Sequence, residues 1–150
     1  MHRITAVIAA LASAALLVPA ALADQPTRFP LPAGTFTISG SCPFEVQAEP
    51  VANKEFVTIL DSGKVIITGQ LMYRLTSPYK SIVVNISGPG FTTTTSPNFE
   101  LSGASLLFYP GHLLLTRGPV LLTFDANGNI TSVTQTSAAA TDLCAVLADP

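Results

Sequence analysis

The sequence carries little charge. Its 150 residues include 7 Lys and Arg side chains and 9 Asp and Glu side chains, which gives a formal net charge of -2. A protein that binds nucleic acid presents a basic patch, and one that binds an anionic membrane surface carries clusters of Lys and Arg. The composition therefore excludes both kinds of partner, and the length favours a single domain.

The sequence also lacks the common catalytic motifs. It contains no G-x-S-x-G, no H-E-x-x-H, no Walker loop and no Rossmann glycine set. His112 is the one histidine after residue 23, and its Pro-Gly context indicates a solvated loop. Glu45, Glu49 and Glu100 fall on polar strand faces, whereas a glycosidase needs two carboxylates that face one cleft. We therefore predict no catalytic residue, no cofactor and no metal site.

One long apolar run is present, at the N-terminus. Residues 4–18 are apolar or small and precede an A-x-A sequence at residues 21–23. This arrangement is typical of a secretory signal peptide that is cleaved before Asp24. The run is shorter than the ~20 residues of a membrane-spanning helix, and no basic stop-transfer cluster follows it. We expect an extracellular protein with no transmembrane segment after cleavage, and a membrane anchor is the alternative.

The sequence contains two cysteines, Cys42 and Cys144, and no C-x-x-C pair. An even number of cysteines in an exported chain predicts a disulfide. Such a bridge would close a loop of about 100 residues, worth up to ~4.7 kcal/mol in the chain-entropy model. Two buried free thiols are the alternative, and a metal site is disfavoured because a single histidine follows the signal peptide.

The rest of the sequence alternates apolar and polar residues in short stretches separated by turn residues. The clearest prediction is a hairpin of two strands, residues 64–76 and 80–87. Gly69 predicts a kink in the first of these strands, and Asn127-Gly128 predicts a tight hairpin turn. The other expected elements are strands at residues 35–39, 44–49, 56–60, 91–95, 99–109, 113–116, 120–124 and 130–136, and a short helix over 142–147 capped by Thr141.

This pattern predicts an all-β protein. No long amphipathic helix intervenes, so a parallel sheet is disfavoured. We expect an antiparallel up-and-down meander closed into a small barrel of about eight strands, with a short C-terminal helix, because closure removes exposed edges. A two-sheet β-sandwich is the alternative. The expected organisation is a signal peptide (1–23), a Pro-rich extended lead-in (24–34) and a single β domain (35–150).

Three stretches carry a resemblance to a known group of proteins. They are VNISGPG at residues 84–90, TFDANGNIT at 123–131 and DLC at 142–144. Together they resemble small secreted β-rich proteins of actinobacteria that have a signal peptide, one early and one C-terminal cysteine, and no assigned activity. The resemblance covers most of residues 35–147. It implies secretion and the disulfide, and it transfers no catalytic residue.

Two polar residues in the predicted hairpin share the register of its apolar residues. Tyr73 and Lys80 have this position, and Tyr79 lies near the same hairpin end. If the apolar faces line a barrel, these three side chains would lie at its mouth and orient an apolar ligand that carries a carboxylate. The alternative is that Tyr73 is a core aromatic residue and that Lys80 is a strand-end charge extending into water.

The segment 106–115 departs from alternation, because both of its faces are apolar. Either both faces are buried under the C-terminal helix, or the segment forms an exposed patch that binds a partner or a lipid surface. In the second case the patch would include Leu107, Phe108, Tyr109 and Leu114.

Three functions remain open. The first is a secreted, non-catalytic β-barrel protein that binds a small apolar ligand. The second is an extracellular interaction or structural protein that uses the segment 106–115. The third is a small enzyme of the isomerase or cyclase type, in which Tyr73 and Lys80 would act. We place them in this order because the apolar faces are extensive and no catalytic set is present.

Overall fold

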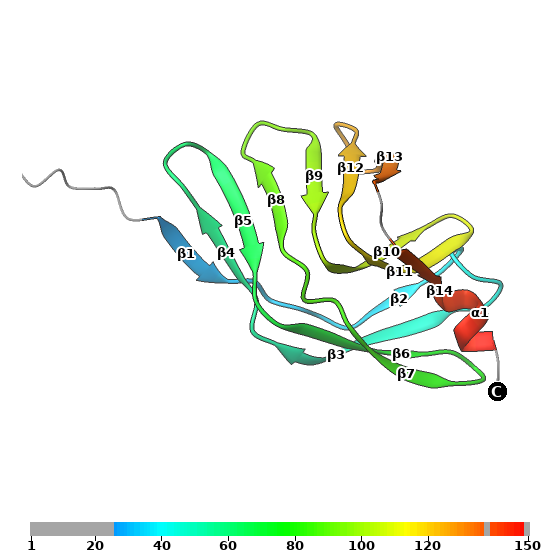
Figure 1. The fold of residues 1–150 in the computed structure, drawn as a ribbon. Helices are drawn as coiled ribbons and strands as arrows, with labels where there is room; N and C mark the ends of the chain where they lie inside the picture. Colours follow the sequence, from blue (N-terminus) through cyan, green and yellow to red (C-terminus); the bar gives the residue numbers. More distant parts are fainter. Residues whose placement is uncertain (1–25, 137–138, 149–150) are drawn as a thin grey trace, which may run out of the picture.

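The computed structural model describes residues 26–136 and 139–148. The predicted signal peptide at residues 1–23 lies outside the described residues. The described chain forms 14 β-strands and one short helix (Figure 1). The elements are β1 (Thr27–Pro30), β2 (Phe36–Ile38), β3 (Val46–Asn53), β4 (Phe56–Ile59), β5 (Lys64–Thr68), β6 (Leu71–Thr76), β7 (Ser81–Asn85), β8 (Gly90–Thr93), β9 (Asn98–Leu101), β10 (Ala104–Tyr109), β11 (His112–Arg117), β12 (Val120–Phe124), β13 (Ile130–Gln135), β14 (Ala139–Asp142) and α1 (Leu143–Ala148).

The strands form three antiparallel sheets. A seven-stranded sheet has the order β1-β4-β5-β8-β9-β12-β13, a four-stranded sheet has the order β2-β3-β6-β7, and a three-stranded sheet has the order β10-β11-β14. In Figure 1, β1, β4, β5, β8 and β9 stand side by side in the upper part of the molecule, and β2, β3, β6 and β7 lie below them. The chain passes between these two sheets several times.

Each passage is a bend in a long stretch of extended chain. The bend between β5 and β6 lies at Gly69, whose φ of 142° is in the range that only glycine adopts easily. A Cβ atom at Gly69 would overlap the carbonyl oxygen of Lys54, which lies in the neighbouring bend between β3 and β4. The backbone N–H of Lys54 donates a hydrogen bond to the carbonyl oxygen of Gln70 at 2.7 Å. The kink predicted at Gly69 is therefore confirmed, and it separates the predicted strand 64–76 into strands of two different sheets.

The predicted barrel is wrong. In the described residues the seven-stranded sheet begins at β1 and ends at β13, these two strands do not pair with each other, and neither of the smaller sheets closes. The physical reason is the series of bends, because a strand that turns a corner leaves one sheet and enters another instead of continuing around a barrel. The all-β class, the antiparallel pairing and the short C-terminal helix are as predicted, and the arrangement fits the sandwich alternative.

Some strand limits also differ from the prediction. Strand β3 continues through Pro50 with a shift of register between Pro50 and Ala52, and this bulge accommodates the missing N–H of proline. The predicted strand 99–109 is divided into β9 and β10, which belong to different sheets. Strand β1 lies in the predicted lead-in, and β14 lies where the sequence predicted no strand.

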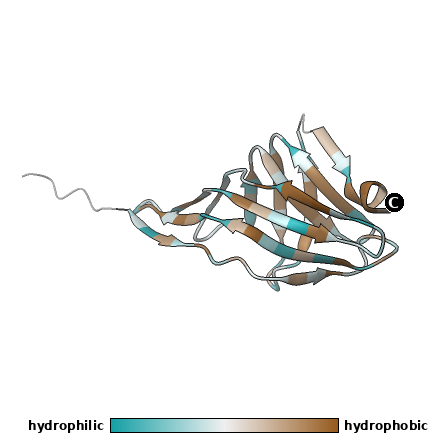
Figure 2. Ribbon diagram, turned by 90° about the horizontal axis from the view of Figure 1, so that it is seen from below, coloured by the Kyte–Doolittle hydropathy of each residue, from teal (hydrophilic) through white to brown (hydrophobic). Residues whose placement is uncertain are grey.

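Two cores hold the sheets together. In the first, the four-stranded sheet packs against β11 and α1, with Val46, Leu75, Leu113 and Leu147 fully buried. In the second, Leu107 of β10 packs against two residues of β12. The three-stranded sheet therefore has core contacts on both faces. Figure 2 shows alternating apolar and polar bands along many of the strands. In β10 and β11 consecutive residues are apolar, which allows burial on both faces.

The C-terminal helix is short and closely attached. The Asp142 carboxylate accepts a hydrogen bond from the Cys144 backbone N–H at 2.9 Å, so Asp142 caps the helix instead of the predicted Thr141, which lies in β14. At the other end, the Ser77 hydroxyl donates to the Leu147 carbonyl oxygen at 2.7 Å. Over residues 26–136 and 139–148, no helix has the length and apolar character needed to cross a membrane.

Candidate functional site

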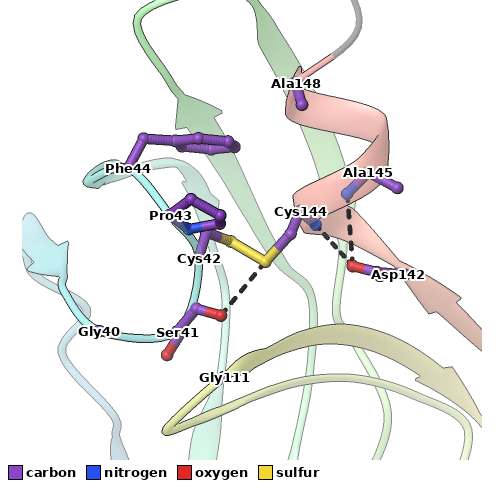
Figure 3. A pocket seen from close by; sticks show the side chains of 10 residues that line it. All are labelled: Gly40, Ser41, Cys42, Pro43, Phe44, Gly111, Asp142, Cys144, Ala145 and Ala148. Atoms are coloured by element: carbon purple, nitrogen blue, oxygen red, sulfur yellow. Dashed lines mark hydrogen bonds between the residues drawn. A yellow bond between two sulfur atoms is a disulfide. The ribbon is translucent and has the colours of Figure 1, made fainter.

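The predicted disulfide is present. Cys42 and Cys144 are joined with an S–S distance of 1.97 Å and a Cα–Cα distance of 5.4 Å. The bridge attaches the loop ahead of β3 to α1 (Figure 3). Both cysteines of the chain are therefore used, and neither is available as a nucleophile or a metal ligand. Among the described residues, no group of three His, Cys, Asp or Glu side chains could hold a metal ion.

A hollow of about 610 Å³ lies beside the disulfide. Figure 3 shows it between the loop that carries Cys42 and the first turn of α1. Its one carboxylate, Asp142, already accepts hydrogen bonds from the backbone N–H groups of Cys144 and Ala145. Phe44 on its rim packs edge to face against Tyr79, with ring centroids 5.6 Å apart. The Asp142 carboxylate in this hollow therefore already serves as the N-cap of α1.

A second, smaller hollow has a different character. It has a volume of about 190 Å³ and lies where the long stretches of chain bend from one sheet to another. We call it the corner cavity. Two of the side chains that line it, Glu55 and Ser105, have polar groups, and the apolar lining includes Leu31, Ile67, Leu71, Ile86, Phe99, Leu101 and Leu106.

The corner cavity adjoins a wider hollow on the outside of the molecule. This outer hollow has a volume of about 630 Å³ and is lined by residues of the β1–β2 connection and of the bend between β3 and β4. Leu31 and Glu55 line both the corner cavity and the outer hollow. These two residues therefore lie at the boundary between the interior and the surface.

The backbone around Glu55 is firmly held. The Glu55 N–H donates to the Asn53 side-chain oxygen at 2.9 Å, and its carbonyl oxygen accepts a hydrogen bond from the Leu31 N–H at 2.9 Å. The Asn53 amide in turn donates to the Leu31 carbonyl oxygen at 2.7 Å. Glu55 is only 8% exposed, and this burial raises the pKa of its carboxyl group. The one ion pair in the described part of the chain joins Arg74 to Glu49 on the surface.

Ser105, one of the residues that line the corner cavity, has a fully buried hydroxyl group. It is 5% exposed, and its Oγ is the one buried side-chain nitrogen or oxygen in the described residues that has no hydrogen-bond partner. Thr116, which pairs with Ser105 across the hairpin, donates its own hydroxyl to the Ser105 carbonyl oxygen at 3.3 Å. Buried polar groups in folded proteins are normally paired, so a free buried hydroxyl calls for an explanation such as a bound molecule.

The structure does not bring the predicted ligand residues together. Tyr73 is 5% exposed, and its hydroxyl donates to the Gly34 carbonyl oxygen at 3.0 Å. Burial, and secondarily the nearby Glu55 carboxylate, raises the pKa of Tyr73. Tyr79 is 59% exposed in the turn between β6 and β7, and the backbone of Lys80 completes that turn by bonding to Ser77. Since no barrel is present, the mouth at which these side chains were expected to meet does not form.

The four residues of the predicted interaction patch have different surroundings. Leu107 is 3% exposed and belongs to the second core, and Leu114 packs against the same core. Phe108 is 43% exposed and lies beside Phe36, with ring centroids 5.7 Å apart. Tyr109 is partly buried and packs against a histidine ring. Of the four, Phe108 therefore presents the main apolar surface to solvent.

The prediction from sequence missed Glu55 and Ser105. A signal for Glu55 exists, because it shares the two-residue period of Val57 and Ile59, which places a carboxylate in register with an apolar strand face. Ser105 likewise shares the period of Leu107. A serine in that position is common in strands, so only its missing hydrogen-bond partner distinguishes it.

The burial of Glu55 predicts a specific dependence of stability on pH. Its pKa in the folded protein is raised above the ordinary value of 4.5, so the folded state holds this proton more tightly than the unfolded state. The resulting contribution to stability is complete below pH 4.5 and is lost as pH rises through the raised pKa. Glu55→Gln should abolish this contribution, which thermal unfolding of both proteins between pH 4 and pH 8 would measure.

The exposed Glu100 supplies the matched control. Glu100→Gln should leave the pH profile of the unfolding temperature as it is in the wild-type protein. The difference in unfolding temperature between Glu55→Gln and wild type should shift in favour of the variant as pH rises. A difference that stays constant over the whole pH range would show that Glu55 does not titrate in a buried setting.

Comparisons with known proteins assign neither a family nor a function to this chain. No protein-family model matches the chain, and no curated protein or solved structure is significantly similar to it. The fold and its hollows therefore define the class: an open, multi-sheet β protein with one disulfide and an apolar cavity at the corner of its sheets.

Proposed function

We propose that the protein is an exported, non-catalytic binding protein that holds a small apolar ligand in the corner cavity. The observation that carries this proposal is the lining of the corner cavity, which is mostly apolar and includes the two polar residues Glu55 and Ser105. Ligand sites typically combine apolar walls with a few polar groups that orient the ligand. The corner cavity has this composition.

The dimensions support a ligand of modest size. A volume of about 190 Å³ corresponds to roughly six water molecules at ~30 Å³ each. A linear chain of about six heavy atoms has a similar size, and a larger molecule would extend past Leu31 and Glu55 into the outer hollow. Leu31 and Glu55 are the residues that lie between a ligand in the corner cavity and the outer hollow.

Export is part of the proposal. It rests on the predicted signal peptide at residues 1–23 and on the resemblance to small secreted actinobacterial proteins. The Cys42–Cys144 bridge is consistent with it, because disulfides form and persist in oxidising environments outside the cytosol. The β10–β11 hairpin offers less support for a partner-binding function, since Leu107 and Leu114 pack into the second core.

The proposal can be tested with 1-hexanol as a neutral probe. In a heteronuclear NMR titration, we expect chemical-shift changes concentrated in the methyl groups of Ile67, Leu71, Leu101 and Leu106. Filling the cavity with Ile86→Phe should abolish binding. Ile82→Phe is the matched control, because Ile82, like Ile86, packs against the first core but does not line the corner cavity. Wild-type protein whose methyl signals do not respond to 1-hexanol would overturn the proposal.

A further inference from the structure

We propose that the natural ligand of the corner cavity is an apolar amine, and that the Glu55 carboxylate binds its ammonium group. This inference rests on the proposed function, and it adds the chemical class of the ligand. It starts from two observations: no ion pair in the described residues involves the Glu55 carboxylate, and the buried Ser105 hydroxyl has no hydrogen-bond partner. Both residues line the corner cavity.

The chain itself does not neutralise Glu55. No hydrogen bond or ion pair within the described residues involves its carboxylate oxygens, although its backbone N–H and carbonyl oxygen are both bonded. The neighbouring Lys54 is exposed, and the hydroxyl of Tyr73 is committed to the Gly34 carbonyl oxygen. The carboxylate oxygens are not among the fully buried atoms that lack a partner, so they remain accessible to a ligand. An ammonium group would supply the counter-charge that the described residues lack.

The hydrogen-bonding roles also match an ammonium group. An ammonium has three N–H donors and no acceptor, an ionised carboxylate accepts only, and a serine hydroxyl can accept. An anionic ligand would be repelled by Glu55. This reverses the carboxylate-bearing ligand expected from sequence, which depended on Lys80 lying at a barrel mouth that does not exist.

The position of Glu55 fixes how such a ligand would lie. Glu55 lines both the corner cavity and the outer hollow, so this residue stands at the boundary between them. An ammonium bound there keeps its charge at the entrance, while the apolar body extends inward among Ile67, Leu71 and Leu106. A charged group deeper in the cavity would lose its hydration without any further counter-charge.

Three probes of equal chain length test the inference at pH 7: n-hexylammonium, 1-hexanol and hexanoate. They are titrated by calorimetry and NMR into the disulfide-bonded protein purified from culture fluid. We expect n-hexylammonium to bind about tenfold more tightly than 1-hexanol, which is the factor of a single charge-assisted hydrogen bond. Hexanoate should bind more weakly than either. In Glu55→Gln, the amine and the alcohol should bind equally within about twofold.

The outcomes separate this inference from the proposed function. Glu100→Gln, at an exposed site, should keep the preference for the amine. If 1-hexanol binds but n-hexylammonium binds no more tightly, the inference is wrong and the proposed function stands. If Glu55→Gln is folded by NMR and still prefers the amine, the preference does not come from Glu55 and the inference also fails. If no probe binds, both proposals fall.

Discussion

Replacing both cysteines by serine, C42S/C144S, is expected to lower the free energy of unfolding by up to ~4.7 kcal/mol. The bridge spans a sequence separation of 102 residues, so its removal restores a large amount of chain entropy to the unfolded state. It also attaches α1, whose Leu143 and Leu147 are core residues, to the loop ahead of β3. A loss of this size would lower Tm by roughly 15–20 °C, at about 4 °C per kcal/mol for a domain of this length.

Thermal unfolding of three samples measures this effect: the oxidised protein, the reduced protein and the double variant. The reduced protein and the double variant should unfold at similar temperatures, because both lack the same covalent restraint. A double variant whose Tm lies within about 2 °C of the oxidised protein would show that the bridge adds little to the stability of this fold.

Substituting alanine for Gly69 is expected to cost roughly 2–4 kcal/mol of stability. Two independent effects add at this position. The φ of 142° is unfavourable for any residue with a Cβ, and that Cβ would overlap the Lys54 carbonyl oxygen and lie 2.6 Å from the Glu55 Cα. The neighbouring bend would have to move, and Glu55 with it. Urea unfolding of the variant measures the cost, and a parallel titration should show weaker binding of n-hexylammonium.

Gly34→Ala is the matched control. A Cβ at Gly34 would have no heavy atom within 4 Å, so this substitution should be neutral or slightly stabilising through its effect on the unfolded chain. Equal stabilities of the Gly69 and Gly34 variants would mean that the corner between β5 and β6 is not restricted to glycine. The bend between β5 and β6 would then have a cause other than the glycine at position 69.

Local features of the fold were predictable from sequence, because they depend on neighbouring residues. The kink at Gly69 and the tight turn at Gly128, where φ is 82°, follow from residue types that accept unusual backbone angles. Whether the sheet closes into a barrel was not predictable from sequence. An alternating pattern shows that a strand has one buried face, but it does not show whether a bent strand keeps its partner or enters another sheet. The separation of β9 from β10 at Gly103 is such a case.

The site was harder to predict than the fold. The alternation of apolar and polar residues correctly placed Tyr73 on a buried strand face. It placed Lys80 on the same face, but Lys80 lies in the turn ahead of β7. Glu55 lies in the bend directly ahead of β4, outside the strand whose two-residue period it shares. Its backbone neighbours include Leu31 and Gly69, which are distant in sequence and approach it only in the folded chain.

Native mass spectrometry of the protein purified from the culture fluid of its own host tests the central claim most directly. We predict a polypeptide that starts at Asp24 and carries a non-covalent adduct of low mass, which is lost on denaturation and is absent from Ile86→Phe. Ile82→Phe should retain the adduct. A bare wild-type polypeptide that also fails to take up 1-hexanol or n-hexylammonium would contradict the assignment of the corner cavity as a ligand site.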